Sequence, residues 1–340
     1  MKAVAYQNPG SLDRPDALVD VVLEELTAQG RDLLVRVEAV SVNPADYKVR
    51  SGVLPQQGQW KVLGWDAVGT VVGAGDAVKN FRVGDQVWYA GSLTRPGANS
   101  EFHLVDERIV GHKPASLSNA QAAALPLTAI TAWEMLFDRL DVAKPVPGAA
   151  NAILIIGGAG GVGSIAIQLI RALTDLTVIV TASRAETREW VKQLGADHVI
   201  DHSKPLAAQV EALGIGEPAF VFSTTETLRH LAEIVELIAP QGRFGLIDDP
   251  DVLDITPFKR KSVSVHWELM FTRSLFETAD MDAQGRLLDE VARLVDEGRI
   301  RTTLTDVLSP INAENLRKAH AVLESGRARG KIVAEGWEDA

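Results

Sequence analysis

The sequence contains no cysteine among its 340 residues. This absence excludes disulfide bonds, thiolate catalysis, iron–sulfur clusters and cysteine-rich zinc sites. No apolar run reaches the ~18 residues that a membrane-spanning helix needs. Asn8 and Pro9 interrupt the start of the chain before the apolar core of a signal peptide could form. We therefore expect a cytoplasmic protein with no membrane partner.

Positive charge is also scarce, with 34 Lys and Arg residues against 45 Asp and Glu residues and a formal net charge of −11. An acidic surface repels phosphate backbones and anionic membranes, so nucleic acid is not an expected partner. The 46% of hydrophobic and 23% of charged residues are typical of a soluble globular enzyme. The length is sufficient for two domains.

The first part of the chain, up to about Leu125, shows short β-type runs separated by glycine and proline turns. This spacing predicts a compact, largely antiparallel β domain. The clearest predicted strands are 33–42, 68–72, 86–89 and 102–105.

From about Pro126, predicted strands and helices alternate, which favours a parallel sheet wrapped by helices. The predicted strands are 152–156, 177–181, 198–200, 219–222, 243–247 and 262–267, and the predicted helices are 162–173, 185–194 and 228–238. After Asp280 the pattern changes to a helix at 287–295 and strands at 304–308 and 331–334, so we expect the chain to return to the first domain. The predicted domain ranges are 1–126, 127–274 and 275–340.

A glycine-rich turn directly follows the buried strand 152–156, and Gly158, Gly160 and Gly163 fit the pattern G-x-G-x-x-G between a strand and a helix. One glycine permits the tight turn, one lets the backbone approach a pyrophosphate, and one lets helix pack on strand. The helix N-terminus presents unpaired N–H groups to the phosphates. The turn therefore predicts dinucleotide binding by Gly158, Ala159, Gly160, Gly161, Val162 and Gly163. The alternative is a turn that binds nothing; a P-loop is disfavoured because Gly163 is followed by Ser164.

The end of the second buried strand indicates which dinucleotide binds. NAD-binding folds usually place an acid there to hold the ribose 2′-hydroxyl. Here the strand is followed by Ser183 and Arg184, and Glu186 comes only in the next turn. Because arginine suits phosphate geometry, we predict NADPH rather than NADH, with Arg188 as a further candidate contact. The alternative is a solvated arginine at a helix start.

The order of these motifs resembles the medium-chain dehydrogenase/reductase superfamily over nearly the whole chain. The resemblance is carried by SVNPADYKVRSG at 41–52, GWDAVG at 64–69, VGDQV at 83–87, PLTAITAW at 126–133, the glycine turn, LGADHVI at 194–200 and GKIV at 330–333. In detail the chain resembles the quinone oxidoreductase (zeta-crystallin-like) branch, and the segment 264–274 is similar to a subgroup often labelled zinc-type alcohol dehydrogenase-like. The resemblance implies an α/β fold, in which a GroES-like β-rich catalytic domain accompanies a Rossmann dinucleotide-binding domain with a doubly wound parallel sheet. It also implies a homodimer joined through the apolar edge strand 262–267.

The zinc ligands of that superfamily are missing. Its zinc alcohol dehydrogenases use a cysteine, the histidine of a Gly-His-Glu segment and a later cysteine, but here the first position is Asn43 and the segment reads Gly64-Trp65-Asp66. His198 and His202 lie by a strand end, where structural or nucleotide-adjacent roles are favoured, so we predict no metal. Without a Lewis acid, the expected acceptors are quinones and α,β-unsaturated carbonyl compounds, because the charge that hydride addition creates is delocalised onto an oxygen that hydrogen-bond donors can stabilise.

The resemblance also implies which residues act. Asn43, Asp46 and Tyr47 occupy the segment that faces the nicotinamide in the superfamily; Asn43 or Tyr47 could donate to the substrate oxygen, and Tyr47 could supply a proton. The alternative is that Asn43 and Asp46 only cap a turn, while Trp65 is expected to form a wall of the pocket. The further cofactor-binding candidates are Thr128, Ser183, Arg184, His202, Ser223, Thr224, Ile247, Asp248 and Lys331.

Together these features predict a zinc-independent, NADPH-dependent oxidoreductase that reduces quinones or α,β-unsaturated carbonyl compounds. One alternative is an alcohol or aldehyde dehydrogenase of the same superfamily, which the missing zinc ligands disfavour. The other is a non-catalytic NADPH-binding sensor or structural protein, which would not need the polar segment from Asn43 to Tyr47.

Overall fold

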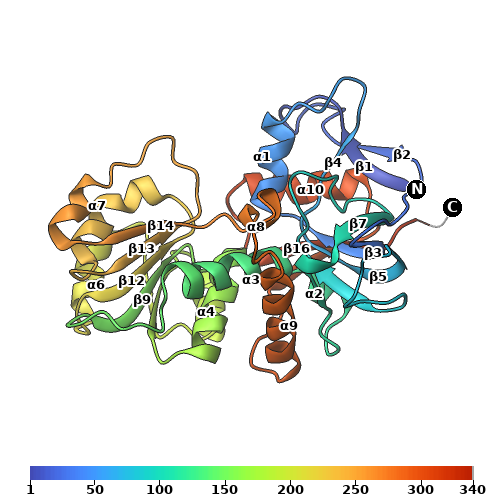
Figure 1. Cartoon of the computed structure of the whole chain (residues 1–340). Coiled ribbons are helices and arrows are strands. Elements are labelled where there is room, and N and C mark those ends of the chain that lie inside the picture. Colours follow the sequence, from blue (N-terminus) through green and yellow to red (C-terminus); the bar gives the residue numbers. More distant parts are fainter. Residues whose placement is uncertain (339–340) are drawn as a thin grey trace. The chain divides into compact units, whose positions relative to one another are not determined.

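The computed structural model describes residues 1–338 (Figure 1). The chain divides into two compact units. One runs from Thr131 to Met270, and the other combines residues 1–130 with the chain from Phe271 onward. The helix α3 (Pro126–Trp133) contains the first point at which the chain passes from one unit to the other.

The unit 131–270 is built on a parallel sheet with the strand order β11-β10-β9-β12-β13-β14. Its strands are β9 (Ala150–Ile156), β10 (Thr177–Thr181), β11 (His198–Ile200), β12 (Pro218–Ser223), β13 (Arg243–Leu246) and β14 (Ser264–Trp267). Its helical segments are η2 (Glu134–Arg139), α4 (Gly161–Leu173), α5 (Ala185–Gln193), α6 (Leu206–Ala212), α7 (Thr227–Leu237) and η3 (Thr256–Lys261). The strand order reverses between β9 and β12, so the predicted doubly wound sheet is confirmed, and ligands of such sheets bind at the carboxyl ends beside this reversal.

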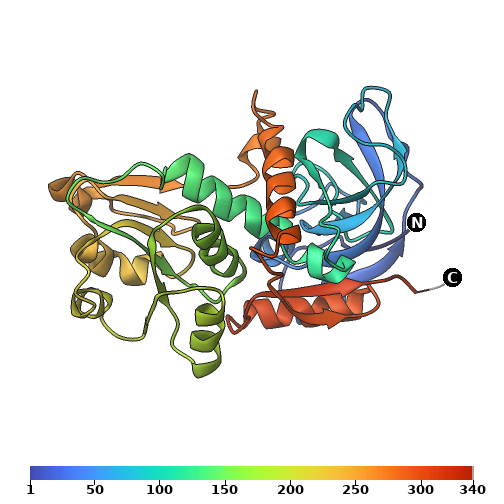
Figure 2. The ribbon, with the colours of Figure 1, turned by 90° about the horizontal axis from the view of Figure 1, so that it is seen from below.

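Apolar strands and helices on both faces hold this sheet together. Leu154 and Ile156 of β9 and Val221 of β12 are buried in one cluster with residues of α6 and α7. Figure 1 shows α6 and α7 on one side of the sheet and α4 on the other, and Figure 2 gives a second view of the same layers. Residues 163–170 of α4 are all buried. A strand buried on both faces needs apolar residues in succession, which explains why β9 is a continuous apolar run.

The second unit, residues 1–130 with the chain from 271, is rich in antiparallel β structure. Its strands are β1 (Lys2–Tyr6), β2 (Val19–Val22), β3 (Asp32–Ser41), β4 (Lys61–Val62), β5 (Ala67–Ala74), β6 (Gln86–Tyr89), β7 (Phe102–Asp106), β8 (Val110–His112), β15 (Leu304–Leu308) and β16 (Lys331–Glu335). Its remaining helical segments are α1 (Pro44–Gly52), η1 (Glu107–Ile109), α2 (Asn119–Ala123), α8 (Thr272–Leu275), α9 (Ala283–Asp296) and α10 (Ala313–Glu324).

The largest sheet of this unit shows how the end of the chain completes its beginning. Its order is β15-β16-β3-β5-β6-β8, with β7 also paired to β3. All of these pairs are antiparallel except the parallel pair of β15 and β16. The end of the chain thus adds β16 to the sheet that contains β3.

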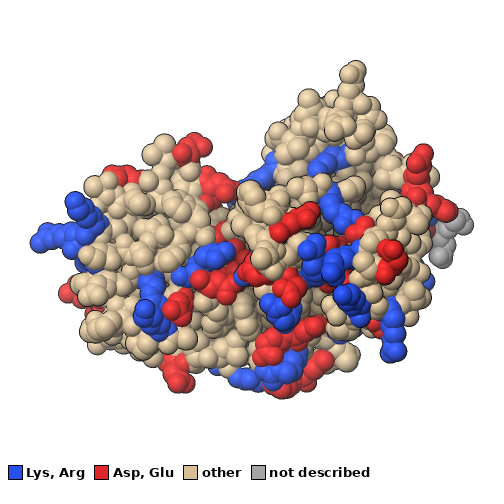
Figure 3. Space-filling model, in the orientation of Figure 1, with Lys and Arg blue, Asp and Glu red and all other residues tan. Residues whose placement is uncertain are grey.

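The surface of the described residues carries both signs of charge. Figure 3 shows acidic and basic side chains side by side over the part of this face where α9 lies. On that helix Arg293 pairs with Glu290 and with Glu297, and Arg286 pairs with Asp282. The acidic excess is therefore not gathered into one patch on this face. Within residues 1–338, no helix is long and apolar enough to cross a membrane.

Candidate functional site

The turn between β9 and α4 requires glycine at three positions. Gly157 has a φ of +85°, a left-handed conformation that disfavours other residues. A β-carbon at Gly158 would lie 1.8 Å from Cγ1 of Val180, and one at Gly163 would lie 2.5 Å from the carbonyl oxygen of Gly157. The protein's own packing therefore demands glycine at these three positions.

Gly160 differs from the other glycines of this turn. Its φ of −70° suits any residue, and the nearest atom to an added β-carbon would be the carbonyl oxygen of Gly157 at 3.5 Å, an ordinary contact. Gly160 is the N-cap of α4, it provides no side-chain cap, and the first turn of α4 contains no acidic residue. Gly160 therefore leaves the first N–H groups of α4 without a side-chain cap, which fits the close approach of a pyrophosphate.

Arginines follow the neighbouring strand β10. Arg184 is the N-cap of α5, and its Nε lies 2.9 Å from Oε1 of Glu186. The Arg188 guanidinium instead donates to the carbonyl oxygens of Ala182 (3.1 Å) and Val199 (2.9 Å), which ties the end of β10 to β11. Arg188 is therefore used within the unit, and Arg184 is the better candidate for contact with a 2′-phosphate.

Two further candidates lie beside this edge of the sheet. Ser183 is exposed, and His202, two residues beyond β11, is half-buried. Burial lowers the pKa of His202, and the nearby Arg229 and Arg184 guanidiniums lower it further against the opposing effect of Asp201. The imidazole is therefore neutral at pH 7, and any contact to the cofactor would be that of a neutral ring.

The predicted residues after β12 bond mainly within their own unit. The hydroxyls of Ser223 and Thr227 lie 2.7 Å apart, and the N–H and hydroxyl of Thr227 donate to the Asp248 carboxylate at 2.9 and 2.5 Å. The hydroxyl of Thr224 donates to the carbonyl oxygen of Ile156 at 2.8 Å. These bonds hold the carboxyl ends of β9, β12 and β13 in place. The backbone N–H of Ile247 also donates to Ser223, at 3.3 Å.

In the other unit, a buried ion pair lies at the start of α1. The Lys331 ammonium of β16 donates to Oδ2 of Asp66 at 2.8 Å, to the carbonyl oxygen of Val42 at 3.1 Å, and to Oδ1 of Asn43. Lys331 is 4% exposed and Asp66 is 0% exposed. All three ammonium hydrogens have acceptors here, so a contact between Lys331 and a cofactor phosphate would break one of these bonds. The phosphate role of Lys331 stays a prediction.

Asn43 has no hydrogen-bonding group to spare for a substrate. Its Oδ1 accepts from Lys331, and its Nδ2 donates to Oδ2 of Asp66 at 2.8 Å, with the carbonyl oxygens of Ser41 and Trp65 both at 3.4 Å. The side chain is 1% exposed. Of the two predicted donors to the substrate oxygen, Asn43 and Tyr47, Asn43 is therefore already occupied by hydrogen bonds within the protein. Tyr47 is the remaining candidate.

Asp46 is also committed to the fold. One oxygen of its buried carboxyl accepts from the N–H of Asn43 at 2.7 Å and the other from the N–H of Gly64 at 2.9 Å. Burial raises the pKa of Asp46 to about 7, although both N–H groups and the Lys331 ammonium act in the opposite direction. This arrangement matches the capping alternative for Asp46 at the start of α1.

Tyr47 differs from the other two tyrosines of the sequence. The Tyr6 hydroxyl donates to the carbonyl oxygens of Val49 (3.0 Å) and Val53 (2.7 Å), and the Tyr89 hydroxyl lies 3.1 Å from Nδ1 of His103. Tyr47 is half-buried on α1, and its hydroxyl has no hydrogen-bond partner within the described part of the chain. It therefore remains available as a donor.

Thr128 and Trp65 occupy structural positions. Thr128 is buried in α3, and its hydroxyl donates to the carbonyl oxygen of Leu125 at 3.0 Å. Trp65 is fully buried, its Nε1 donates to the carbonyl oxygen of Ser92 at 3.2 Å, and its ring meets Phe271 edge-on. The cofactor contact of Thr128 and the pocket-wall position of Trp65 stay predictions.

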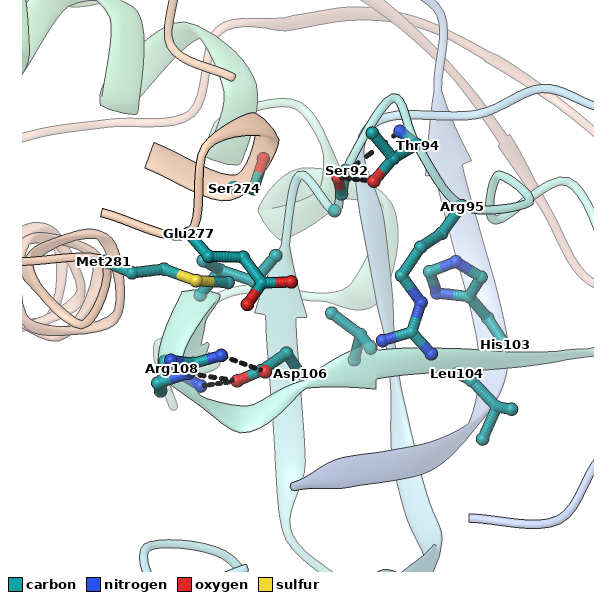
Figure 4. A pocket seen from close by; sticks show the side chains of 13 residues that line it. Ser92, Thr94, Arg95, His103, Leu104, Asp106, Arg108, Ser274, Glu277 and Met281 are labelled. Carbon is teal, nitrogen blue, oxygen red and sulfur yellow. Dashed lines mark hydrogen bonds and ion pairs between the residues drawn. The ribbon is translucent and has the colours of Figure 1, made fainter. Parts of the chain in front are cut away.

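A small pocket in the same unit is lined in part by Ser92 (Figure 4). Its polar side chains are largely paired with one another. The Arg108 guanidinium bonds to the Asp106 carboxylate at 2.8 Å, and the Ser92 hydroxyl lies 3.0 Å from the Thr94 hydroxyl. None of the predicted site residues lines this pocket, so we do not assign the reaction to it.

The residues at the expected metal position do not fit zinc. A catalytic zinc site takes thiolate, imidazole or carboxylate ligands in a tetrahedron. At the matching positions stand the Asn43 amide and the buried Trp65 indole, and the Asp66 carboxylate already binds the Lys331 ammonium. The residues that the structure describes contain no group of three His, Asp or Glu side chains able to hold a metal.

The sequence resembles known proteins over its whole length. Residues 29–117 match the alcohol dehydrogenase GroES-like domain, and residues 194–333 match the family described as zinc-binding dehydrogenase. A zinc-type alcohol dehydrogenase-like protein, SAS2087 of Staphylococcus aureus, is 37% identical over 98% of this chain and 99% of its own length. The mitochondrial NAD(P)H oxidoreductase RTN4IP1 of Homo sapiens is 33% identical over 89% of this chain and 81% of its own length.

Solved structures show the same fold. A Rhizobium etli CFN 42 protein, provisionally named a zinc-dependent alcohol dehydrogenase, is 66% identical with a TM-score of 0.98 and covers 100% of this chain and 99% of its own. A quinone oxidoreductase of Pseudomonas syringae is 26% identical with a TM-score of 0.82, and the match covers 98% of this chain and 99% of that one.

A third structure is a complex with NADPH. Mycobacterial Rv1454c, complexed with NADPH, is 25% identical with a TM-score of 0.81, and the match covers 99% of this chain and 100% of that one. The doubly wound sheet with its glycine turn, the antiparallel β unit and these similarities agree with one another. The chain belongs to the medium-chain dehydrogenase/reductase superfamily of oxidoreductases, with a GroES-like domain and a Rossmann domain.

Proposed function

We propose that this oxidoreductase uses NADPH to reduce quinones or α,β-unsaturated carbonyl compounds without zinc. Three relatives support the proposal by their names: an NAD(P)H oxidoreductase, a quinone oxidoreductase and a protein complexed with NADPH. The names of two others, which refer to zinc and alcohol, come from relatives at 37% and 66% identity. The proposal therefore rests on the side chains of this chain rather than on names alone.

The cofactor part rests on the glycine turn and on the end of β10. The pyrophosphate would lie on the open side of Gly160, against the N–H groups of the first turn of α4. Arg184 would leave Glu186 to bind the 2′-phosphate, whose charge exceeds that of one carboxylate. A bound NADPH supplies the hydride.

The choice of acceptor rests on one observation: the Lys331 ammonium occupies the oxygens of Asp66, Asn43 and Val42 at the position where a metal would be expected. A lysine ammonium held by three acceptors cannot act as a Lewis acid toward a simple carbonyl. Acceptors that spread the added charge over a conjugated system need only a hydrogen-bond donor. The Tyr47 hydroxyl, which the fold leaves without a partner within the described residues, would be that donor.

A turnover assay tests the proposal. Purified protein, after its metal content has been measured, is mixed with NADPH or NADH and a panel of quinones, enones, simple aldehydes and alcohols, and the nucleotide absorbance is followed. We expect oxidation of NADPH by quinones or enones at rates that added chelator does not change. Gly160→Val is the matched control, since a side chain at this open position should block the nucleotide without disturbing the fold.

Three results would contradict parts of the proposal. Stoichiometric zinc in the purified protein would contradict the metal part. No oxidation of NADPH by any acceptor, or equal rates for the wild type and Gly160→Val, would contradict the reductase part.

A further inference from the structure

Three oxygens from two separate segments converge on one buried nitrogen. The carbonyl oxygen of Val42 and Oδ1 of Asn43 lie just before α1, and Oδ2 of Asp66 lies just before β5. Lys331 reaches them from β16, more than 260 residues further along the chain (|i−j| = 265 for Asp66). This ammonium is therefore the point at which these segments are joined.

The ion pair also fixes neighbouring elements. Oδ1 of Asp66 accepts the N–H of Leu127 at 2.7 Å, in the first turn of α3. Oδ2 of Asp66 accepts both Lys331 and the Asn43 amide, so the ammonium and the carboxylate together set the direction of that amide. Asn43 is the N-cap of α1, the helix that carries Tyr47. A change at Lys331 would thus shift the start of α1 and the Tyr47 hydroxyl.

We propose that the Lys331 ammonium positions Tyr47 through Asn43. When the Lys331 side chain is removed, the space that it leaves binds small primary ammonium ions. The effect on turnover rests on the proposed function of Tyr47. The binding of ammonium ions does not rest on that function, because it requires only the oxygens of Val42, Asn43 and Asp66 and the space left by the removed side chain.

The geometry selects the class of ion. A primary ammonium offers three N–H donors at one end, which matches three converging acceptors. Lys331→Ala removes three methylene groups and the nitrogen, so propylammonium replaces what is missing. Tetramethylammonium carries the same charge but has no N–H donor, and guanidinium is planar and presents its donors in a fork.

The first experiment measures the melting temperature of Lys331→Ala with rising concentrations of propylammonium, tetramethylammonium or guanidinium chloride. At about 100 times its Kd, propylammonium should raise the Tm of the variant by roughly 5–10 °C more than that of the wild type. Tetramethylammonium at equal ionic strength should not. A shift with tetramethylammonium or guanidinium equal to that with propylammonium, or no shift with propylammonium, would overturn the proposal.

The second experiment separates positioning from general stability. Lys331→Ala should lower kcat about 10²-fold, as a displaced catalytic group does, while the Kd for NADPH measured by tryptophan fluorescence stays within about twofold. Propylammonium should recover a tenfold or larger part of the lost kcat. A loss confined to NADPH affinity, or a kcat that propylammonium does not change, would contradict the positioning role.

Lys331→Met keeps the proposal testable even if Lys331→Ala does not fold, because methionine fills the space of the lysine stem without the charge. We expect the same loss of kcat and no response to propylammonium, since the cavity is filled. A kcat within twofold of the wild type would show that the stem and not the ammonium matters.

Lys318→Met is the matched control, because Lys318 forms an exposed pair with Glu314 on α10. If the wild type itself shows no turnover, the proposed function fails while the melting experiment still decides the ammonium site.

Discussion

A β-carbon at Gly158 would lie 1.8 Å from Cγ1 of Val180, whereas one at Gly160 would meet nothing nearer than 3.5 Å. The two glycines therefore serve different purposes within one turn. We expect Gly158→Ala to destabilise the protein by about 1–3 kcal/mol through overpacking. Gly160→Ala should keep the wild-type melting temperature within about 2 °C and lower the affinity for NADPH at least tenfold.

Thermal melting and a fluorescence titration with NADPH check both variants. The opposite pattern, with Gly160→Ala unstable but still binding NADPH normally, would show that Gly160 serves packing and not the nucleotide.

Arg184 should determine the preference between the two nicotinamide nucleotides. We expect Arg184→Glu to raise the KM for NADPH by about 10–100-fold, because a charge-assisted hydrogen bond to phosphate is worth about 1.5–3 kcal/mol. The KM for NADH should change little. Glu186→Gln, which removes the 2.9 Å ion pair between Glu186 and Arg184, should slightly lower the KM for NADPH. Equal losses for both nucleotides in Arg184→Glu would show that Arg184 does not contact the 2′-phosphate.

Tyr47 should supply the hydrogen bond to the substrate oxygen. We expect Tyr47→Phe to lower kcat about 10²-fold with a quinone or enone, the size of effect seen when one donor to a developing oxyanion is removed. The KM for NADPH should stay unchanged. Tyr6→Phe is the control, because the Tyr6 hydroxyl already donates to the carbonyl oxygens of Val49 and Val53. It should lower stability and leave kcat alone; an unchanged kcat in Tyr47→Phe would rule out this donor.

Asp46 should make the stability of the fold depend on pH. Burial raises the pKa of Asp46 to about 7 from an ordinary value of 3.8. Between about pH 4 and pH 7 the folded state therefore holds a proton that the unfolded state has released, so stability falls as the pH rises through this window. The fall is at most about 4 kcal/mol and ends above pH 7.

The difference in melting temperature between the wild type and Asp46→Asn measures this dependence. We expect the melting temperature of the wild type to fall relative to that of Asp46→Asn as the pH rises from 4 to 7. The difference between the two melting temperatures should stay constant from pH 7 to 9. Asp306→Asn, at an exposed position of β15, serves as the comparison and should show no such trend. A difference that grows with pH would contradict the raised pKa.

The edge strand β14 should join two copies of the chain. Within the described residues, β14 has a neighbouring strand only on the side of β13. The N–H groups of Ser264 and Glu268 donate to Gly242 and Leu246 toward β13, so the N–H of Trp267, which alternates with them, faces the open side. Trp267 is also 52% exposed. An open apolar edge favours pairing about a twofold axis.

Light scattering at micromolar concentration checks this prediction. We expect a dimer for the wild type, a weakened dimer for Trp267→Thr, and a monomer for Trp267→Pro, which removes the outward N–H as well as the ring. A monomeric wild type would refute the pairing.

Local patterns were sufficient to predict much of the Rossmann unit, which is the unit from Thr131 to Met270. The predicted strand 177–181 is β10 with the same bounds, and the predicted helix 162–173 is α4 with one more residue, Gly161, at its start. Apolar runs and glycines are sufficient to predict these bounds because each strand or helix is formed by consecutive residues and the next element follows after a short turn. The predicted start of β14 at Ser262 was wrong, since Ser262 has a φ of 51° and the strand begins at Ser264.

The environment of the candidate site could not be predicted in the same way. Nothing near Lys331 in the sequence indicates Asp66 as its partner, because the two are 265 residues apart and meet only through the pairing of β16 with β3. The same is true of Arg188, whose two carbonyl acceptors depend on the arrangement of β10 and β11. Partners that are distant in the sequence decide which polar side chains remain able to bind a ligand. For this reason the sequence predicted the same donor role for Asn43 and Tyr47, whereas in the structure the Asn43 side chain is bonded to Lys331 and Asp66 and the Tyr47 hydroxyl is not.

The pairing of β16 with β3 also sets the order in which the protein is completed during synthesis. The Ser41 hydroxyl donates to the carbonyl oxygen of Ile332 at 2.8 Å across 291 residues. A ribosome adds about 5–20 residues per second, so roughly 15–60 s pass between the two. The Rossmann unit is continuous from Thr131 to Met270 and can fold in that interval. The unit that emerges first is thus finished last, and residues 39–41 of β3 remain an unpaired edge, open to chaperones and to other nascent chains, until β16 arrives.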